Sequence, residues 1–185
     1  MQMAFHLGAH ATDDERLVRT LAANPEALAN ARTLVPAPRH YRPLLREALI
    51  ALKGERADAT TQKRLLDACA NGSEGEIGRL VFSHENFLAM PDRVIGPNGF
   101  YPLAAGKLGP LANLFPEAET EFHLGLLNPA VLLNALVARQ SARSYDDILM
   151  GHAPESLRWL PVIERMANAA KAAGVPVTVP FAPGR

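Results

Sequence analysis

The stretch Met3-Ala-Phe-His-Leu-Gly-Ala-His-Ala-Thr-Asp-Asp-Glu15 decides the fold. A short apolar run that ends at a glycine, here Gly8, is typical of a buried strand. The residues behind it have the apolar spacing of one helix face that continues to Leu28. Thr12 and Glu15 have the spacing of a capping box, which predicts that this helix begins there. We therefore expect a strand, a tight loop and a helix in this order.

The same alternation of apolar runs and helical patterns continues along the chain. Further strands are predicted at Arg79–Ser83, Thr120–Leu127 and Val175–Val179, the last as an edge strand or with Pro176 at its start. Helices are predicted at Leu44–Leu52 (opened by Pro43), Thr60–Ala70, Leu103–Phe115, Asn128–Gln140 (capped by Asn128), Tyr145–Met150 and Glu155–Ala173. The alternation predicts a single three-layer α/β domain over residues 1–185, with a mostly parallel sheet of four or five strands flanked by helices.

The composition excludes several classes of protein. Nineteen Lys and Arg balance nineteen Asp and Glu among 185 residues, so we expect no binding to nucleic acid or to membrane surfaces. The one cysteine, Cys69, excludes an internal disulfide framework and a cysteine-rich zinc site. No apolar run has the length of a membrane span and no signal peptide is recognisable, so a cytoplasmic protein is expected.

Ligands of open α/β sheets bind beyond the carboxyl ends of the strands, which directs attention to three short segments. They are Gly8–Glu15, Ser83–Asn86 and Leu127–Pro129. The first segment has the layout of a phosphate-binding loop, because a strand passes through a glycine into a helix N-terminus. No base for Ser83 is recognisable in the sequence, so nucleophilic catalysis by its hydroxyl is not expected.

These segments resemble, in order and spacing, three motifs of the P-loop sulfotransferases. His6-Leu-Gly-Ala-His10 is similar to the start of their phosphosulfate-binding loop, and Val81-Phe-Ser-His-Glu-Asn-Phe87 to a Ser-x-Glu-Asn-Phe strand end. Leu124-Gly-Leu-Leu-Asn-Pro-Ala130 is similar to a Leu-Arg-Asn-Pro-x-Asp run. The resemblance covers about residues 4–179. It implies that the chain lacks further helices and loops that commonly follow this point in members of the family.

The resemblance implies a fold, a cofactor and a reaction. The cofactor would be 3′-phosphoadenosine 5′-phosphosulfate, and the acceptor a hydroxyl group of a small molecule or carbohydrate. The residues implied for cofactor binding are Gly8, Ala9, His10, Ala11, Thr12 and Asn128. Glu85 or His84 would be the general base; the alternative role of Glu85 is structural, as a carboxylate that accepts from nearby loop amides.

The chain departs from the family pattern where that pattern holds phosphate. The phosphate-binding Lys falls near Ala11 or Thr12, the Arg position holds Leu127 and the following Ser position holds Ala135. Acidic residues Asp13-Asp14-Glu15 replace the Gly-Thr-Thr segment, and carboxylates at that place would repel a phosphate. Two hypotheses follow: an active sulfotransferase that holds the donor by backbone amides, or a non-catalytic binding or interaction module. The second is favoured, and the sequence predicts no metal site and no oligomeric state.

Overall fold

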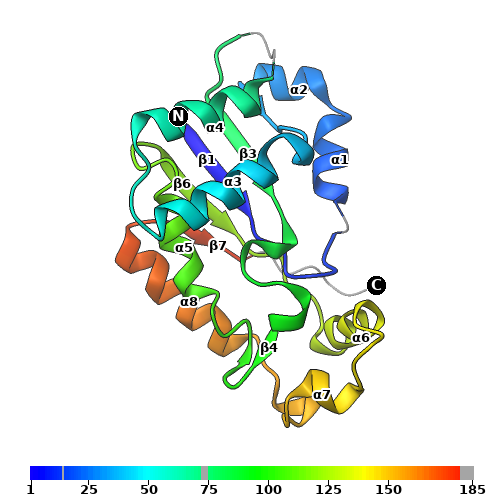
Figure 1. Cartoon of the computed structure of the whole chain (residues 1–185). Coiled ribbons are helices and arrows are strands. Elements are labelled where there is room, and N and C mark those ends of the chain that lie inside the picture. Colours follow the sequence, from blue (N-terminus) through cyan, green and yellow to red (C-terminus); the bar gives the residue numbers. More distant parts are fainter. Residues whose placement is uncertain (14, 72–74, 180–185) are drawn as a thin grey trace.

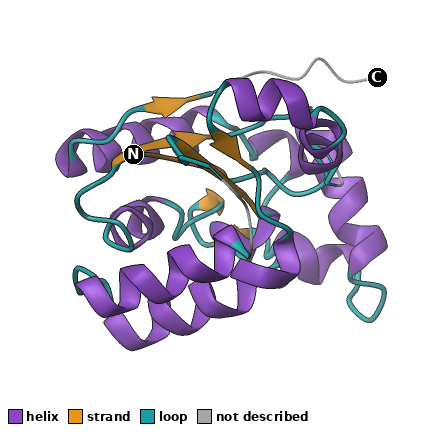
Figure 2. Cartoon of the chain, turned by 90° about the horizontal axis from the view of Figure 1, so that it is seen from above, coloured by secondary structure: helices purple, strands orange, loops and turns teal. Residues whose placement is uncertain are grey.

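A computed structural model describes residues 1–13, 15–71 and 75–179 of the chain. It confirms the predicted α/β fold: a sheet of five parallel strands in the order β2-β3-β1-β6-β7 is flanked by helices (Figures 1 and 2). The strands are β1 (Gln2–His6), β2 (Thr33–Leu34), β3 (Arg79–Ser83), β6 (Glu119–His123) and β7 (Val177–Thr178). Strands β4 (Ile95–Gly96) and β5 (Gly99–Phe100) form a separate antiparallel pair.

The helices connect these strands. They are α1 (Arg16–Ala22), α2 (Pro25–Asn30), α3 (Pro38–Leu52), α4 (Ala59–Ala70), α5 (Ala105–Ala112), α6 (Pro129–Arg139), α7 (Tyr145–Leu149) and α8 (Leu160–Ala173). Short 3-10 turns cover Glu85–Phe87, Pro91–Arg93 and Pro154–Ser156.

The central strand β1 sets the position of everything that follows. It pairs with β3 on one side and with β6 on the other, in a register that places His6 beside both Ser83 and His123. Because parallel strands end at the same edge of a sheet, the three segments singled out in the sequence meet there. The loop of residues 8–12, here called the β1 loop, therefore lies between the ends of β3 and β6.

The two faces of the sheet differ in how they are covered. Phe5, Phe82 and Phe122 are fully buried; the ring of Phe5 packs against the rings of both others, and Tyr41 of α3 packs edge-on against Phe82. Helices α3 and α4 cross in front of this face (Figure 1). Side chains alternate along a strand, so Ala4, His6 and Val81 point to the other face, where α1 and α2 lie.

Two predicted helices begin or end elsewhere. The helix expected to reach Leu28 is wrong: α1 ends at Ala22, and Pro25 starts a second short helix because proline cannot continue the first. The helix expected to open at Pro43 begins at Pro38, which occupies the first turn where a missing N–H costs nothing. Pro43 is accommodated inside α3 at the loss of one intrahelical hydrogen bond.

Other boundaries are shorter than predicted. Strand β6 ends at His123 rather than Leu127, α5 covers only Ala105–Ala112, and α8 starts at Leu160 after a 3-10 turn. Gly174 ends α8 in the left-handed conformation, as predicted. The edge position of the last strand is also confirmed, with Pro176 directly before it.

Candidate functional site

The β1 loop is held against the ends of two strands. Its first part continues the sheet, because Leu7 N–H donates to His123 O at 2.8 Å and Ala9 N–H to Gly125 O at 2.7 Å. Gly8 has φ of 77°, and a Cβ on it would lie 3.1 Å from Glu85 Cα. The loop therefore passes so close to the end of β3 that only glycine fits.

The backbone amides of residues 9–12 in the β1 loop already have partners inside the protein. His10 N–H donates to the hydroxyl of Tyr101 at 2.9 Å, and Ala11 N–H donates to Glu85 Oε2 at 3.3 Å. Thr12 N–H donates to Ala9 O at 3.3 Å. In a phosphate-binding loop these groups would point at the anion. Here the Glu85 carboxylate and the Tyr101 hydroxyl take the place of that anion.

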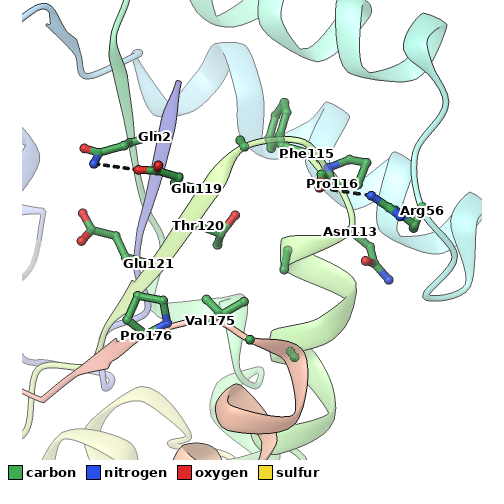
Figure 3. A pocket seen from close by; sticks show the side chains of 14 residues that line it. Gln2, Arg56, Asn113, Phe115, Pro116, Glu119, Thr120, Glu121, Val175 and Pro176 are labelled. Atoms are coloured by element: carbon green, nitrogen blue, oxygen red, sulfur yellow. Dashed lines mark hydrogen bonds between the residues drawn. The ribbon is translucent and has the colours of Figure 1, made fainter.

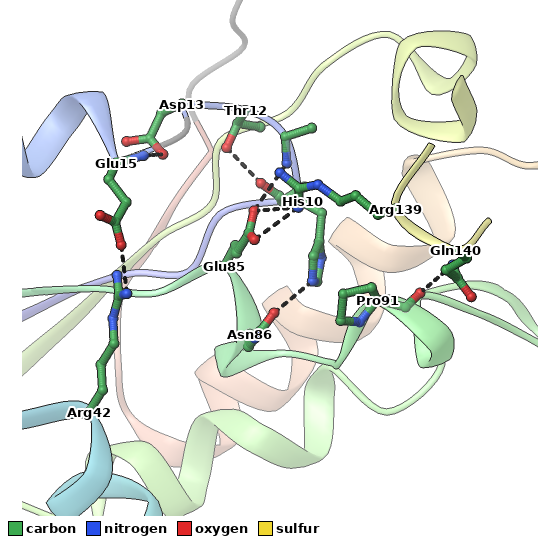
Figure 4. Close-up of polar contacts among 12 residues, drawn as sticks. His10, Thr12, Asp13, Glu15, Arg42, Glu85, Asn86, Pro91, Arg139 and Gln140 are labelled. Atoms are coloured by element: carbon green, nitrogen blue, oxygen red, sulfur yellow. Dashed lines mark hydrogen bonds and ion pairs between the residues drawn. The ribbon is translucent and has the colours of Figure 1, made fainter. Parts of the chain in front are cut away.

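Glu85 is the anion at the centre of this arrangement (Figure 4). Arg139 Nη1 lies 2.9 Å from each of its two carboxylate oxygens, so α6 supplies a cation directly to the end of β3. Burial disfavours the charged form, but the Arg139 guanidinium and the Ala11 N–H outweigh it and lower the pKa of Glu85. Both carboxylate oxygens are thus engaged, which supports the structural role of Glu85 over the role of general base.

The lowered pKa of Glu85 predicts an acid-sensitive contribution to stability. The contribution is present above the unfolded-state pKa of about 4.3 and is lost as the pH falls through the lower folded-state value. Below about pH 5, the melting temperature of Glu85→Gln should therefore fall less steeply than that of the wild type. The control is Glu47→Gln, which removes an exposed ion pair with Arg64 and should stay close to the wild type. Equal slopes for wild type and Glu85→Gln would contradict the assignment.

His10 is buried in a fixed network rather than presented to solvent. Its Nε2 lies 3.0 Å from Asn86 Oδ1 and its Nδ1 lies 2.8 Å from the Tyr101 hydroxyl. Since Asn86 Oδ1 can only accept, Nε2 carries the proton, and Tyr101 donates its own proton to Nδ1. Burial is the main cause that lowers the pKa of His10, so the ring is neutral. The ring fixes the β1 loop to residues 86 and 101.

His84, the other candidate base, lies next to Glu85 but faces different neighbours. Its ring packs edge-on against Phe87 at 5.5 Å between ring centres. Burial and the nearby Arg42 guanidinium lower the pKa of His84 to about 4, so it is neutral at pH 7. A neutral imidazole can accept a proton, and its use as a base stays a prediction.

The entrance to α1 is built differently from the predicted capping box, which is wrong. Thr12 Oγ1 donates to Ala9 O at 2.6 Å and makes no cap. Asp13 instead accepts from Leu17 N–H at 2.9 Å and from Glu15 N–H at 3.2 Å. Glu15 turns away to Arg42, with 2.6 Å between Oε1 and Nη1 (Figure 4). Asp14 lies outside the described residues.

The third strand end supplies a helix cap. Asn128 Oδ1 accepts from Ala130 N–H at 2.8 Å, which confirms the predicted cap of α6. The carbonyl of Leu127 accepts from Trp159 Nε1 at 2.7 Å. The side chain of Asn128 therefore already has a structural partner, and its role in cofactor binding stays a prediction.

Sequence reasoning missed three partners in this region. Arg139 and Tyr101 were not connected to Glu85 and His10, from which they are far in sequence. His6 Nδ1 lies 2.8 Å from Ser83 Oγ, although no base for that serine was recognised. The parallel register was the available signal, because both residues end adjacent strands. Ser83 is only 4% exposed, so its hydroxyl is not presented to a substrate.

A cavity of about 620 Å³ lies at the opposite end of the sheet, where β6 begins (Figure 3). Thr120 points into it, and its Oγ1 is buried with no hydrogen-bond partner among the described residues. The wall includes Arg56, Asn113 and Glu119. Since the β1 loop follows the other end of the strands, this cavity is not part of the candidate site.

No helix in the described part of the chain is long and apolar enough to span a membrane. Within the same residues, no group of three or more His, Cys, Asp or Glu side chains could hold a metal ion. Comparison with protein-family models and with curated proteins finds no match to this chain.

Proposed function

We propose that this chain is a sulfotransferase-like protein that has lost donor binding and acts as a non-catalytic binding or interaction module. The observation that carries the proposal is the internal occupation of the β1 loop. The amides of His10 and Ala11 donate to Tyr101 and Glu85, so a donor phosphate would have to displace both. The Glu85 carboxylate would also repel it at close range.

The side chains around the loop support the same proposal. Glu85 accepts from the Ala11 amide and also pairs with Arg139, so the positive charge of Arg139 is already matched by that carboxylate. The positions that hold the nucleotide in the resembled family carry Leu127 and Ala135, which offer neither charge nor hydroxyl. Backbone amides alone would therefore have to bind a multiply charged nucleotide against an internal competitor.

Isothermal titration with 3′-phosphoadenosine 5′-phosphate tests this proposal, because the desulfated nucleotide needs the same phosphate contacts. We expect no saturable heat and no shift in melting temperature for the wild type. Binding tighter than about 10 μM, which corresponds to about −7 kcal/mol, would overturn the proposal and favour an active sulfotransferase.

The variant Glu85→Gln serves as the matched control, since it removes the competing negative charge at nearly constant side-chain volume. If Glu85 is what excludes the anion, Glu85→Gln should bind the nucleotide measurably more tightly than the wild type. Equal absence of binding in both would contradict the part assigned to Glu85.

A further inference from the structure

A second cavity, of about 600 Å³, lies between the sheet and the pair of helices α1 and α2. Its volume falls in the range of small-molecule sites. It reaches the carboxyl ends of β1 and β6, where ligands of open α/β sheets bind.

One wall of this cavity is apolar and incompletely packed. Leu17 and Leu21 of α1 and Leu28 of α2 face Ala4 and Val81 of the sheet across it. Neither helix buries any residue fully, although these leucines are on the side toward the sheet. An apolar body placed between the leucines and the sheet would remove this surface from water.

The other end of the cavity offers a small number of polar groups. His6 and His123 lie side by side in the register of β1 and β6. His6 Nδ1 is taken by Ser83. His123 Nε2 is buried without a hydrogen-bond partner among the described residues, and Glu121 Oε1 lies 3.4 Å from it. A ligand hydroxyl or N–H would give this nitrogen a partner.

The charges around the cavity select against an anion. Arg79 lines it, but this guanidinium is ion-paired with Glu121. Asp13 lines it as well and accepts from the backbone N–H groups of Glu15 and Leu17 at the start of α1. Two carboxylates, Asp13 and Glu121, therefore accompany the one guanidinium of Arg79, and these three groups sum to a formal charge of −1.

We propose that this cavity binds a neutral amphipathic small molecule, with an aromatic or alicyclic body between the leucines and the sheet and a hydrogen-bonding group at His123. The site gives the proposed binding module a ligand class but uses none of the β1-loop amides. The two tests are therefore independent: absence of probe binding would overturn this proposal and leave the conclusion on donor binding intact, whereas nucleotide binding would overturn that conclusion and leave this proposal intact.

Two fluorescent probes with the same aromatic body test the proposal: N-phenyl-1-naphthylamine, which is neutral, and 8-anilino-1-naphthalenesulfonate, which carries a sulfonate. We expect saturable binding of the neutral probe to the full chain, and binding of the sulfonate at least about ten-fold weaker. No saturable binding of the neutral probe, or equal affinity for both, would overturn the proposal.

Two variants locate the site. Ala4→Leu fills the cavity from β1 and should weaken the neutral probe about ten-fold or more, while Ala51→Leu makes the same change on the exposed side of α3 and should not. Leu21→Gln, at a partly exposed helix position, should weaken the probe without the packing risk of Ala4→Leu. Unchanged binding in both Ala4→Leu and Leu21→Gln would place the probe elsewhere and overturn the site.

Discussion

Replacing Gly8 by alanine should lower the free energy of unfolding by about 3 kcal/mol. Gly8 has φ of 77°, a conformation that costs an alanine about 1–2 kcal/mol. The added Cβ would also lie 3.1 Å from Glu85 Cα and 3.3 Å from its Cβ. Since the first of these atoms belongs to the backbone, the end of β3 or the β1 loop has to move.

That movement has a second consequence for the site. Glu85 is the residue that accepts from Ala11 N–H and pairs with Arg139, so displacing it weakens both contacts. Chemical denaturation of Gly8→Ala measures the total effect. Gly106→Ala is the control, because Gly106 lies in α5 with nothing within 4 Å of its added Cβ. It should be neutral or stabilising by up to about 1 kcal/mol. Equal effects of the two substitutions would contradict a steric requirement for glycine at position 8.

The strands of the sheet could be predicted from the sequence because each is a local pattern. Arg79–Ser83 was predicted with its observed bounds, and the run ending at Gly8 with an error of about one residue at each end. The meeting of their carboxyl ends at one edge of the sheet could also be predicted, since parallel strands connected by helices all end at the same edge. Local stop and start signals, such as Gly174 and Asn128, were equally readable.

The helices next to prolines could not be delimited in the same way. Two prolines five residues apart, Pro38 and Pro43, both suit a first turn, and the sequence pattern preferred the later one. Tertiary contacts decide for the earlier one: Tyr41 and Arg42, in the first turns of α3, both donate to the carbonyl of Ser83. These bonds hold the first turns of α3 against the end of β3.

The chemistry of the site depends on partners that are distant in sequence. Asn86 and Tyr101 meet His10 across 76 and 91 residues, and Arg139 meets Glu85 across 54. No periodicity encodes such pairs, because they depend on how loops and α6 are placed over the strand ends. The sequence could therefore suggest that Glu85 accepts from loop amides, but not that a guanidinium fixes it there.

Tyr101→Phe should cost about 3 kcal/mol of stability, although it removes only one oxygen atom from a fully buried side chain. That oxygen serves His10 twice: it accepts from the backbone N–H at 2.9 Å and donates to Nδ1 at 2.8 Å. Burial raises the pKa of Tyr101, so the hydroxyl keeps the proton that it donates. Without it, two buried polar groups lose their partner, each at a cost of about 1–3 kcal/mol.

A double-mutant cycle separates the two bonds of the Tyr101 hydroxyl. In a His10→Leu background the imidazole is absent, so Tyr101→Phe should cost only the part that comes from the backbone N–H, about half of the wild-type effect. Tyr145→Phe removes a hydroxyl from a side chain that is 45% exposed and should change stability by less than about 0.5 kcal/mol. If Tyr101→Phe behaves like Tyr145→Phe, the hydroxyl does not hold the β1 loop. The His10 amide would then be available to an anion, and its bond to Tyr101 could not account for a loss of donor binding.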